Sequence, residues 1–172
     1  MIKNKNIMKV IAVLAVMIMT SVILTGCELK KKNSDSEKAT TEAYEEPVKN
    51  FVEGLSEANS EKFLKAFPSF IADYAKDIFT DEYLEKTLDN AKETYGDNIT
   101  MTYNIKGKTE LSEEDLKSMV DATKTSFDKD ITITKGYELD LEIHTKGDKD
   151  EDTEDETIDV YEVDGKWCLL NF

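Results

Sequence analysis

Apolar residues recur every three or four positions through the first half of the folded region, which is the spacing of one face of an α-helix. Ser60 and Thr80 are predicted N-caps, because their hydroxyls can accept hydrogen bonds from the first backbone N–H groups of a helix. Pro68 ends one helix and Gly96 ends the last. The predicted inward face consists of Val48, Phe51, Val52, Leu55, Phe63, Leu64, Phe67, Phe70, Ile71, Ala75, Ile78, Phe79, Leu84, Leu88 and Ala91.

The hydrophobic period then changes to two, which predicts a strand with one buried and one solvated face. The alternating apolar residues of this strand are Ile99, Met101, Tyr103 and Ile105. A further helix follows, and its start is well specified. Ser112 and Asp115 form a predicted capping box, with Leu111 and Leu116 as the hydrophobic staple around it.

Three more strands complete the predicted elements. The first runs from Ile131 to Ile143 and is followed by an acidic hairpin loop, Asp148–Glu156. The second is Thr157–Val163, and Asp164-Gly165 predicts a two-residue hairpin turn after it. The closing strand, Lys166–Phe172, is apolar on both faces. It is therefore expected at the centre of the sheet or covered on both sides.

These elements predict an α+β fold, in which N-terminal helices pack on a curved antiparallel sheet as a single cone-like domain over residues 45–172. Helices followed by a strand-rich half that ends in Val163-Asp164-Gly165-Lys166-Trp167-Cys168-Leu169 resemble the nuclear transport factor two-like superfamily. Its members are cone-shaped α+β domains, small secreted lipoproteins among them, and the open end of the cone often forms a pocket. The resemblance implies a fold but no single activity, because the superfamily contains enzymes and non-enzymes.

The N-terminal residues have the order of a secretory signal: lysines, an apolar run from Val10 to Leu24, then small residues. Leu24-Thr25-Gly26-Cys27 resembles the lipobox of bacterial lipoproteins. The resemblance implies that residues 1–26 are removed and that Cys27 carries the lipid. Residues 27–44 are too polar to bury a core and are expected to form a flexible tether. The expected location is the outer face of the cytoplasmic membrane, with the protein anchored by palmitate and related acyl chains.

Charge narrows the range of partners. The formal net charge is −15, so the surface should repel nucleic acid and favour a basic partner. All 22 basic residues are lysine, which removes the bidentate guanidinium often used for phosphate or carboxylate recognition. Lipidation of Cys27 leaves Cys168 without a disulfide partner, and we expect it to be a packed strand residue.

Catalytic or metal-binding chemistry has few candidates in this sequence. His144, the single histidine, shares the polar face of a predicted strand with Asp140 and Glu142, so a solvated surface competes with a general-base role. The alternating acids of Asp148–Glu156 are similar to the start of a calcium loop but lack its central glycine, and a solvated turn is the alternative. We expect no metal and no cofactor.

Two kinds of binding site remain open. Aromatic side chains with polar tips on the inward stripes suit a small apolar ligand, although plain core packing explains them equally well. These residues are Tyr74, Tyr83, Tyr103, Tyr137 and Trp167. The exposed sheet face carries the second site, a surface for a basic protein partner or for a homodimer. Its residues are Glu138, Asp140 and Glu142.

The expected function is therefore a membrane-anchored, non-enzymatic accessory domain that binds a small molecule or a protein. A small cone-fold enzyme of the isomerase, dehydratase or cyclase type is the alternative, and it requires a buried carboxylate or histidine. A spacer or immunity protein that only occludes its partner is a third hypothesis, which the sequence does not separate from the first.

Overall fold

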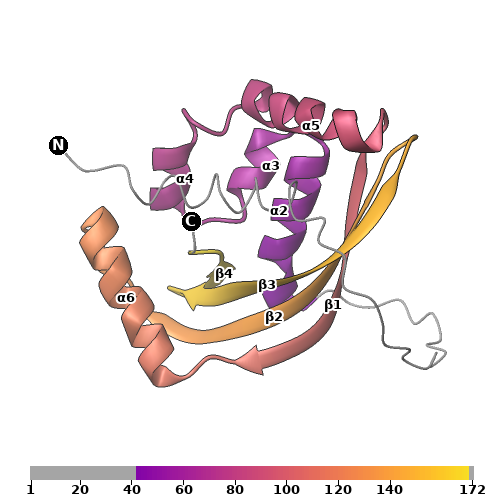
Figure 1. Ribbon diagram of the computed structural model, residues 1–172. Coiled ribbons are helices and arrows are strands. Elements are labelled where there is room, and N and C mark those ends of the chain that lie inside the picture. The colour runs from indigo at the N-terminus through magenta and orange to yellow at the C-terminus, as the bar shows by residue number, and fades with distance from the viewer. Residues whose placement is uncertain (1–41, 171–172) are drawn as a thin grey trace. The chain divides into compact units, whose positions relative to one another are not determined.

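The computed structural model describes residues 42–170 (Figure 1). Its N-terminal half consists of short helices, and its C-terminal half is an antiparallel sheet interrupted by one helix. The helices are η1 (Ala43–Glu45), α2 (Glu46–Ser56), α3 (Ser60–Leu64), α4 (Ser69–Ala75), α5 (Asp81–Tyr95) and α6 (Glu113–Phe127). The strands are β1 (Thr100–Glu110), β2 (Ile133–Lys146), β3 (Glu151–Val163) and β4 (Lys166–Cys168). The predicted α+β fold class is confirmed.

A cluster of phenylalanines holds the N-terminal helices together. Phe63 of α3 is fully buried, and its ring centroid lies 5.1 Å from that of Phe51, 5.5 Å from Phe67 and 5.2 Å from Phe79. These rings come from α2, α3 and the segments that follow α3 and α4. One side chain therefore joins most of the helical layer, which explains why such short helices are stable only together.

The helix ends follow the predicted rules with two exceptions. The first is Pro68: α3 already ends at Leu64, and Pro68 is the N-cap position of α4. Thr80 accepts a hydrogen bond from the N–H of Tyr83, and Ser112 and Asp115 form the capping box of α6. The prediction of Ser60 as an N-cap is wrong. Asn59 is the N-cap of α3, and the N–H of Ser60 instead donates to the distant carboxylate of Asp81 at 2.7 Å.

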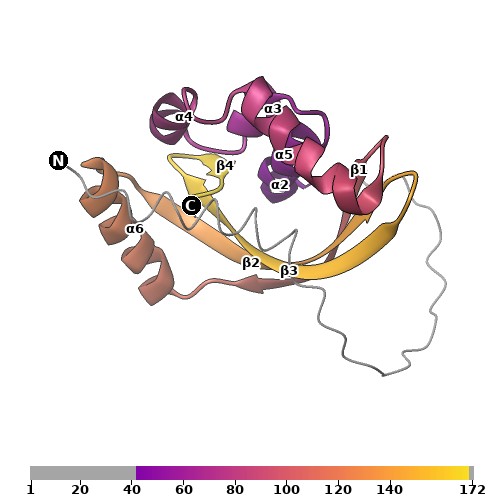
Figure 2. The same cartoon turned by 45° about the horizontal axis from the view of Figure 1, so that its top comes forward.

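The four strands form one sheet in the order β1-β2-β3-β4, and every neighbouring pair is antiparallel. Figure 2 shows the sheet curving beneath α2, α3 and α5. Leu139, Leu141 and Ile143 of β2 are buried and alternate with exposed or half-buried polar residues. This alternation is the predicted half-buried pattern, and it places the core between the sheet and the helices.

The predicted boundaries of the last hairpins need correction. The acidic segment expected as a loop, Asp148–Glu156, is mostly strand, because β3 already begins at Glu151 and pairs with β2 up to Lys146. The predicted strand Thr157–Val163 is therefore too short. Backbone pairing with β2 outweighs the poor strand propensity of the acids, and the ammonium of Lys146 lies 3.1 Å from the carboxylate of Glu151.

The predicted length of the closing strand is wrong, and so is the first of its two expected settings, the centre of the sheet. β4 spans three residues rather than Lys166–Phe172, and it lies at the edge of the sheet instead of the centre. Its apolar residues are nevertheless buried: Cys168, Leu169 and Leu170 are at most 5 % exposed. The chain leaves the sheet after Cys168 and packs beside the helices, so burial on both sides comes from helix packing rather than from strand pairing.

The folded domain begins before the predicted boundary at residue 45. Tyr44, assigned to the tether by the sequence, belongs to η1 and contacts aromatic residues of the sheet. Cys27, the signal segment and the rest of the predicted tether lie outside the described residues. Between residues 42 and 170 no helix is both long enough and apolar enough to cross a membrane.

Candidate binding site

The tyrosines predicted to line one pocket do not come together. Tyr74 is 54 % exposed and lies against Phe127 of α6, with ring centroids 6.1 Å apart. Tyr83 is half-buried on α5 and contacts Phe79, with ring centroids 5.5 Å apart. Tyr103 of β1 faces α2, where burial and nearby carboxylates raise its pKa. The short helices cross at different angles, so stripes that look continuous in the sequence point in different directions.

Tyr137 and Trp167 do meet, in an aromatic cluster with Tyr44. The rings of Tyr137 and Trp167 stack at 5.2 Å with an interplanar angle of 10°, and Tyr44 meets both rings edge-on. The ammonium of Lys108 lies 4.2 Å from the centroid of the Tyr44 ring and 4.8 Å from that of Tyr137, and it pairs with Glu42 at 3.6 Å. This cluster fastens the start of the domain to the sheet. The sequence signal for it was a single tyrosine at the end of a polar segment.

Trp167 also lines a groove beside β4. The groove lies between the α3–α4 segment and the β3–β4 hairpin and has a volume of about 670 Å³. That volume falls within the range of sites that hold drug-sized molecules. Most of the lining is apolar: Leu64, Phe67, Pro68, Phe70, Val163 and Trp167. Of the five predicted pocket residues, Trp167 alone is among the groove residues.

The groove also carries four charged residues, of which three are held by neighbours. Lys65 pairs with Glu61 at 2.9 Å, and the hydrogen bond from Lys65 lowers the pKa of the Glu61 carboxyl. Asp164 accepts a hydrogen bond from the N–H of Thr132 at 3.3 Å. Lys166 makes no ion pair with any residue in the described range. Lys166 is therefore the groove's cation that is open to a ligand carboxylate.

Cys168 lies at the groove but is not a nucleophile. The side chain is 4 % exposed, and its Sγ donates to the carbonyl of Tyr161 at 3.6 Å. Burial, with a smaller effect of the Asp164 charge, raises the pKa of the Cys168 thiol to about 12. A reactive cysteine needs the opposite shift, so the packed role expected from the sequence agrees with this environment.

The raised thiol pKa predicts a loss of stability at high pH. Unfolding returns the Cys168 pKa to an ordinary value near 9.0, so the unfolded state releases its proton first as pH rises. Below that pH, the buried thiol makes its full contribution to the free energy of unfolding. Above it, this contribution falls by about 1.4 kcal/mol per pH unit, up to about pH 12. Urea unfolding at pH 8, 9 and 10 of chains carrying Cys27→Ser, with and without Cys168→Ala, measures the difference. A difference that stays constant with pH contradicts the prediction.

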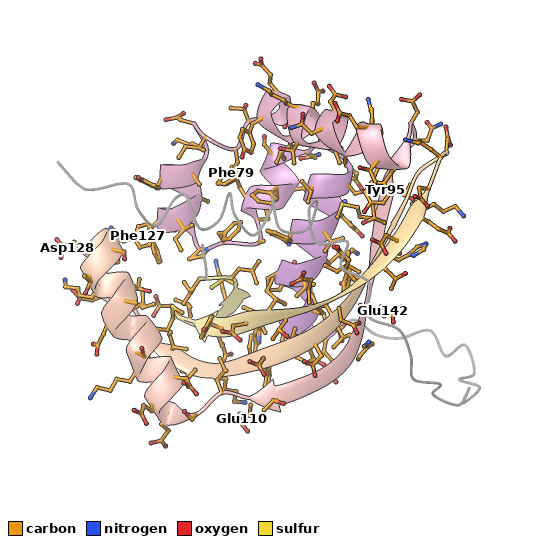
Figure 3. The ribbon with its side chains drawn as sticks, in the orientation of Figure 1. Phe79, Tyr95, Glu110, Phe127, Asp128 and Glu142 are labelled. Carbon is orange, nitrogen blue, oxygen red and sulfur yellow. The ribbon has the colours of Figure 1, made fainter. Side chains whose placement is uncertain are left out.

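The acidic sheet face lies where the sequence placed it. Glu138 and Asp140 are exposed and Glu142 is half-buried, and all three alternate with the buried residues of β2. Figure 3 labels Glu142 on this sheet. The sequence did not identify two further members of this face. Lys106 pairs with Asp155 at 2.6 Å and with Glu142 at 3.7 Å, which relieves the repulsion between these directly opposed acids.

His144 belongs to the same face, and both of its ring nitrogens have neighbours on β3. Its Nδ1 is 3.0 Å from the hydroxyl of Thr153, and its Nε2 is 4.0 Å from the carboxylate of Glu151. Thr123 is the one buried polar side chain among residues 42–170. No group of three or more His, Cys, Asp or Glu side chains in that range is arranged to hold a metal ion.

Comparison with known proteins adds no further evidence about the site. The chain matches no protein-family model, and searches of curated proteins and of solved structures found no match.

Proposed function

We propose that this chain is a lipid-anchored, extracytoplasmic binding protein and that the groove beside β4 is its binding site. The observation that carries the proposal is the groove itself. It combines a volume of about 670 Å³ with largely apolar walls and a half-buried tryptophan. Such a lining gains free energy mainly by burying apolar ligand surface, at roughly 25 cal/mol per Å².

The membrane anchor is a separate part of the same proposal. It rests on Leu24-Thr25-Gly26-Cys27 and the apolar run before it, and not on the folded domain. Two acyl chains on Cys27 give stable anchoring, whereas one chain gives marginal binding. The polar residues after Cys27 then hold the groove near the membrane surface rather than inside the membrane.

The enzyme alternative rests on one half-buried carboxyl in the described residues, that of Glu154, whose pKa is raised by burial and by the charges of Asp152 and Glu156. Proton transfer at neutral pH needs a carboxyl or imidazole whose pKa is tuned by burial or by a close partner. The buried side chains between residues 42 and 170 include no Asp, Glu or His. The candidate groups His144, Asp140 and Glu142 lie on the solvated sheet face.

Native mass spectrometry of the chain from residue 27, with Cys27→Ser and purified from its source, tests the proposal. We expect a mass excess of bound ligand that disappears on denaturation. Leu64→Glu should abolish it, because this substitution places a charge on the groove wall. Leu88→Glu, at a half-buried site on α5, is the matched control and should retain the ligand. A ligand that survives Leu64→Glu, or no ligand in either form, argues against the groove.

A further inference from the structure

The outer edge of β4 has no strand beside it. β4 is the last strand in the sheet order and pairs with β3 alone. Asp164 and Gly165 form a two-residue turn with φ of 50° and 80°, so Val163 and Lys166 close the hairpin as a hydrogen-bonded pair. Hydrogen-bonded and non-hydrogen-bonded pairs alternate along antiparallel strands. The backbone N–H and C=O of Trp167 therefore point away from β3.

The contact at Leu169 supports this orientation. Leu169 has the same backbone orientation as Trp167, and its N–H donates to the carbonyl of Ala66 at 2.8 Å. This hydrogen bond places the segment between α3 and α4 along the outer edge of β4. Past Ala66 the two segments separate, and residues 67–70 form the opposite wall of the groove.

The groove consequently continues the free edge of a β-sheet. Neither the N–H nor the C=O of Trp167 has a hydrogen-bond partner within residues 42–170. A backbone donor and acceptor next to an apolar groove match the backbone of an extended peptide. Main-chain hydrogen bonds then supply affinity, and the groove receives alternate side chains.

Charge limits the peptide further. Glu61 and Lys65 neutralise each other. Asp164 keeps its negative charge, because its partner is only the backbone N–H of Thr132, and Lys166 is the groove cation that has no ion pair among the described residues. At physiological ionic strength, charges farther than about 8 Å are largely screened. A peptide carboxylate that pairs directly with the exposed ammonium of Lys166 is therefore favoured over one elsewhere along the groove, in spite of the protein's net charge of −15.

We infer that the groove binds an extended peptide segment that adds to the outer edge of β4, with apolar side chains against the groove walls and an acidic residue near Lys166. The inference rests on the proposed function, because it names the class of ligand for the same groove. It identifies the partner as a protein segment rather than as a free small molecule.

Titration with blocked pentapeptides tests the inference. The peptides carry a central aspartate flanked by valine, leucine or phenylalanine, and the protein is the chain from residue 27 with Cys27→Ser. Emission of Trp167, the single tryptophan, reports binding at the groove. We expect saturable binding by at least one peptide. N-methylation of the amide that pairs with Trp167 should weaken that binding about tenfold, because one backbone hydrogen bond is lost.

Lys166→Glu tests the charge preference against a matched control. This substitution should lower the affinity for the aspartate peptide severalfold and raise the affinity for the same peptide with a central lysine. Lys117→Glu changes the charge equally on the exposed side of α6 and should leave both affinities unchanged. Both lysines are exposed, so loss of folding does not explain a difference between them.

The outcomes separate the inference from the proposed function. The neutral apolar dye Nile red serves as a second probe, with Leu64→Glu as the variant that should exclude it. Dye binding without binding of any peptide overturns the inference and leaves the proposed function intact. No binding of either probe overturns both. A peptide that binds only after removal of Asn171 and Phe172 also overturns the inference, because the groove then belongs to the chain's own C-terminus.

Discussion

Phe63→Ala is expected to lower the free energy of unfolding by about 3–5 kcal/mol, the cost of deleting a large buried aromatic side chain. Phe63 is 0 % exposed, and its ring lies within 5.5 Å of three other phenylalanine rings, centroid to centroid. The substitution removes the contacts that join α2, α3 and the segment just before α5. It leaves a cavity that these short helices fill only by shifting.

Urea unfolding followed by far-ultraviolet circular dichroism measures the loss, and Tyr74→Ala is the matched control. Tyr74 is 54 % exposed and makes one edge-on contact with Phe127, so its truncation should cost no more than about 1.5 kcal/mol. Similar losses for the two variants would show that the phenylalanine cluster does not hold the helical layer together.

Gly54→Ala is expected to destabilise the domain although alanine is the better helix former. A Cβ at Gly54 would lie 2.5 Å from the Cα of Phe63 and 2.8 Å from its Cβ. Helix propensity favours alanine by about 0.5–1 kcal/mol, whereas overpacking of this kind costs about 1–3 kcal/mol or more. The clash should outweigh the gain in helix propensity, because the Cβ would meet backbone atoms of Phe63. Only a movement of α2 away from α3 would relieve it.

Gly165→Ala provides the comparison for this second prediction. Gly165 has φ of 80°, but no atom lies within 4 Å of the position that a Cβ would take, so its substitution carries conformational cost without a clash. That cost is about 1–2 kcal/mol. Thermal unfolding should show a drop in Tm for both variants. A stabilised Gly54→Ala protein would mean that the α2–α3 contact is loose enough to admit a methyl group.

The two walls of the groove depend on different contacts. The phenylalanine cluster and Gly54 hold the wall of the groove that comes from α3 and the segment after it. The opposite wall comes from the β3–β4 hairpin and is supported by the stacked rings of Tyr137 and Trp167. Variants that loosen the first wall should therefore weaken ligand binding before they unfold the sheet.

Local rules of sequence were sufficient where the deciding interactions are close along the chain. The Thr80 cap, the Ser112 capping box, the Gly96 helix end and the Asp164-Gly165 turn all depend on neighbours within a few residues, and all are confirmed. The alternation of apolar and polar residues also placed Leu139, Leu141 and Ile143 on the core side, because strand periodicity is itself local.

The wrong predictions concern elements whose structure depends on contacts with a distant segment of the chain. The N–H of Ser60 donates to the carboxylate of Asp81, which lies far along the chain, and Asn59 is the N-cap of α3. Pairing with β2 draws the acids after Glu151 into a strand. The carbonyl of Ala66 accepts a hydrogen bond from the N–H of Leu169. The apolar C-terminal segment therefore leaves the sheet, and β4 is an edge strand.

The sequence by itself determined the α+β class, the order of helices and strands, and the acidic, arginine-free surface of this protein. The tertiary structure alone decided which aromatic residues meet and where the groove forms. The physical reason is that periodicity assigns a side chain to a face of its own helix or strand, whereas the angles between elements decide which faces meet. The groove at Trp167 exists because the chain between Ala66 and α4 separates from the outer edge of β4, and no pattern within either segment encodes that separation.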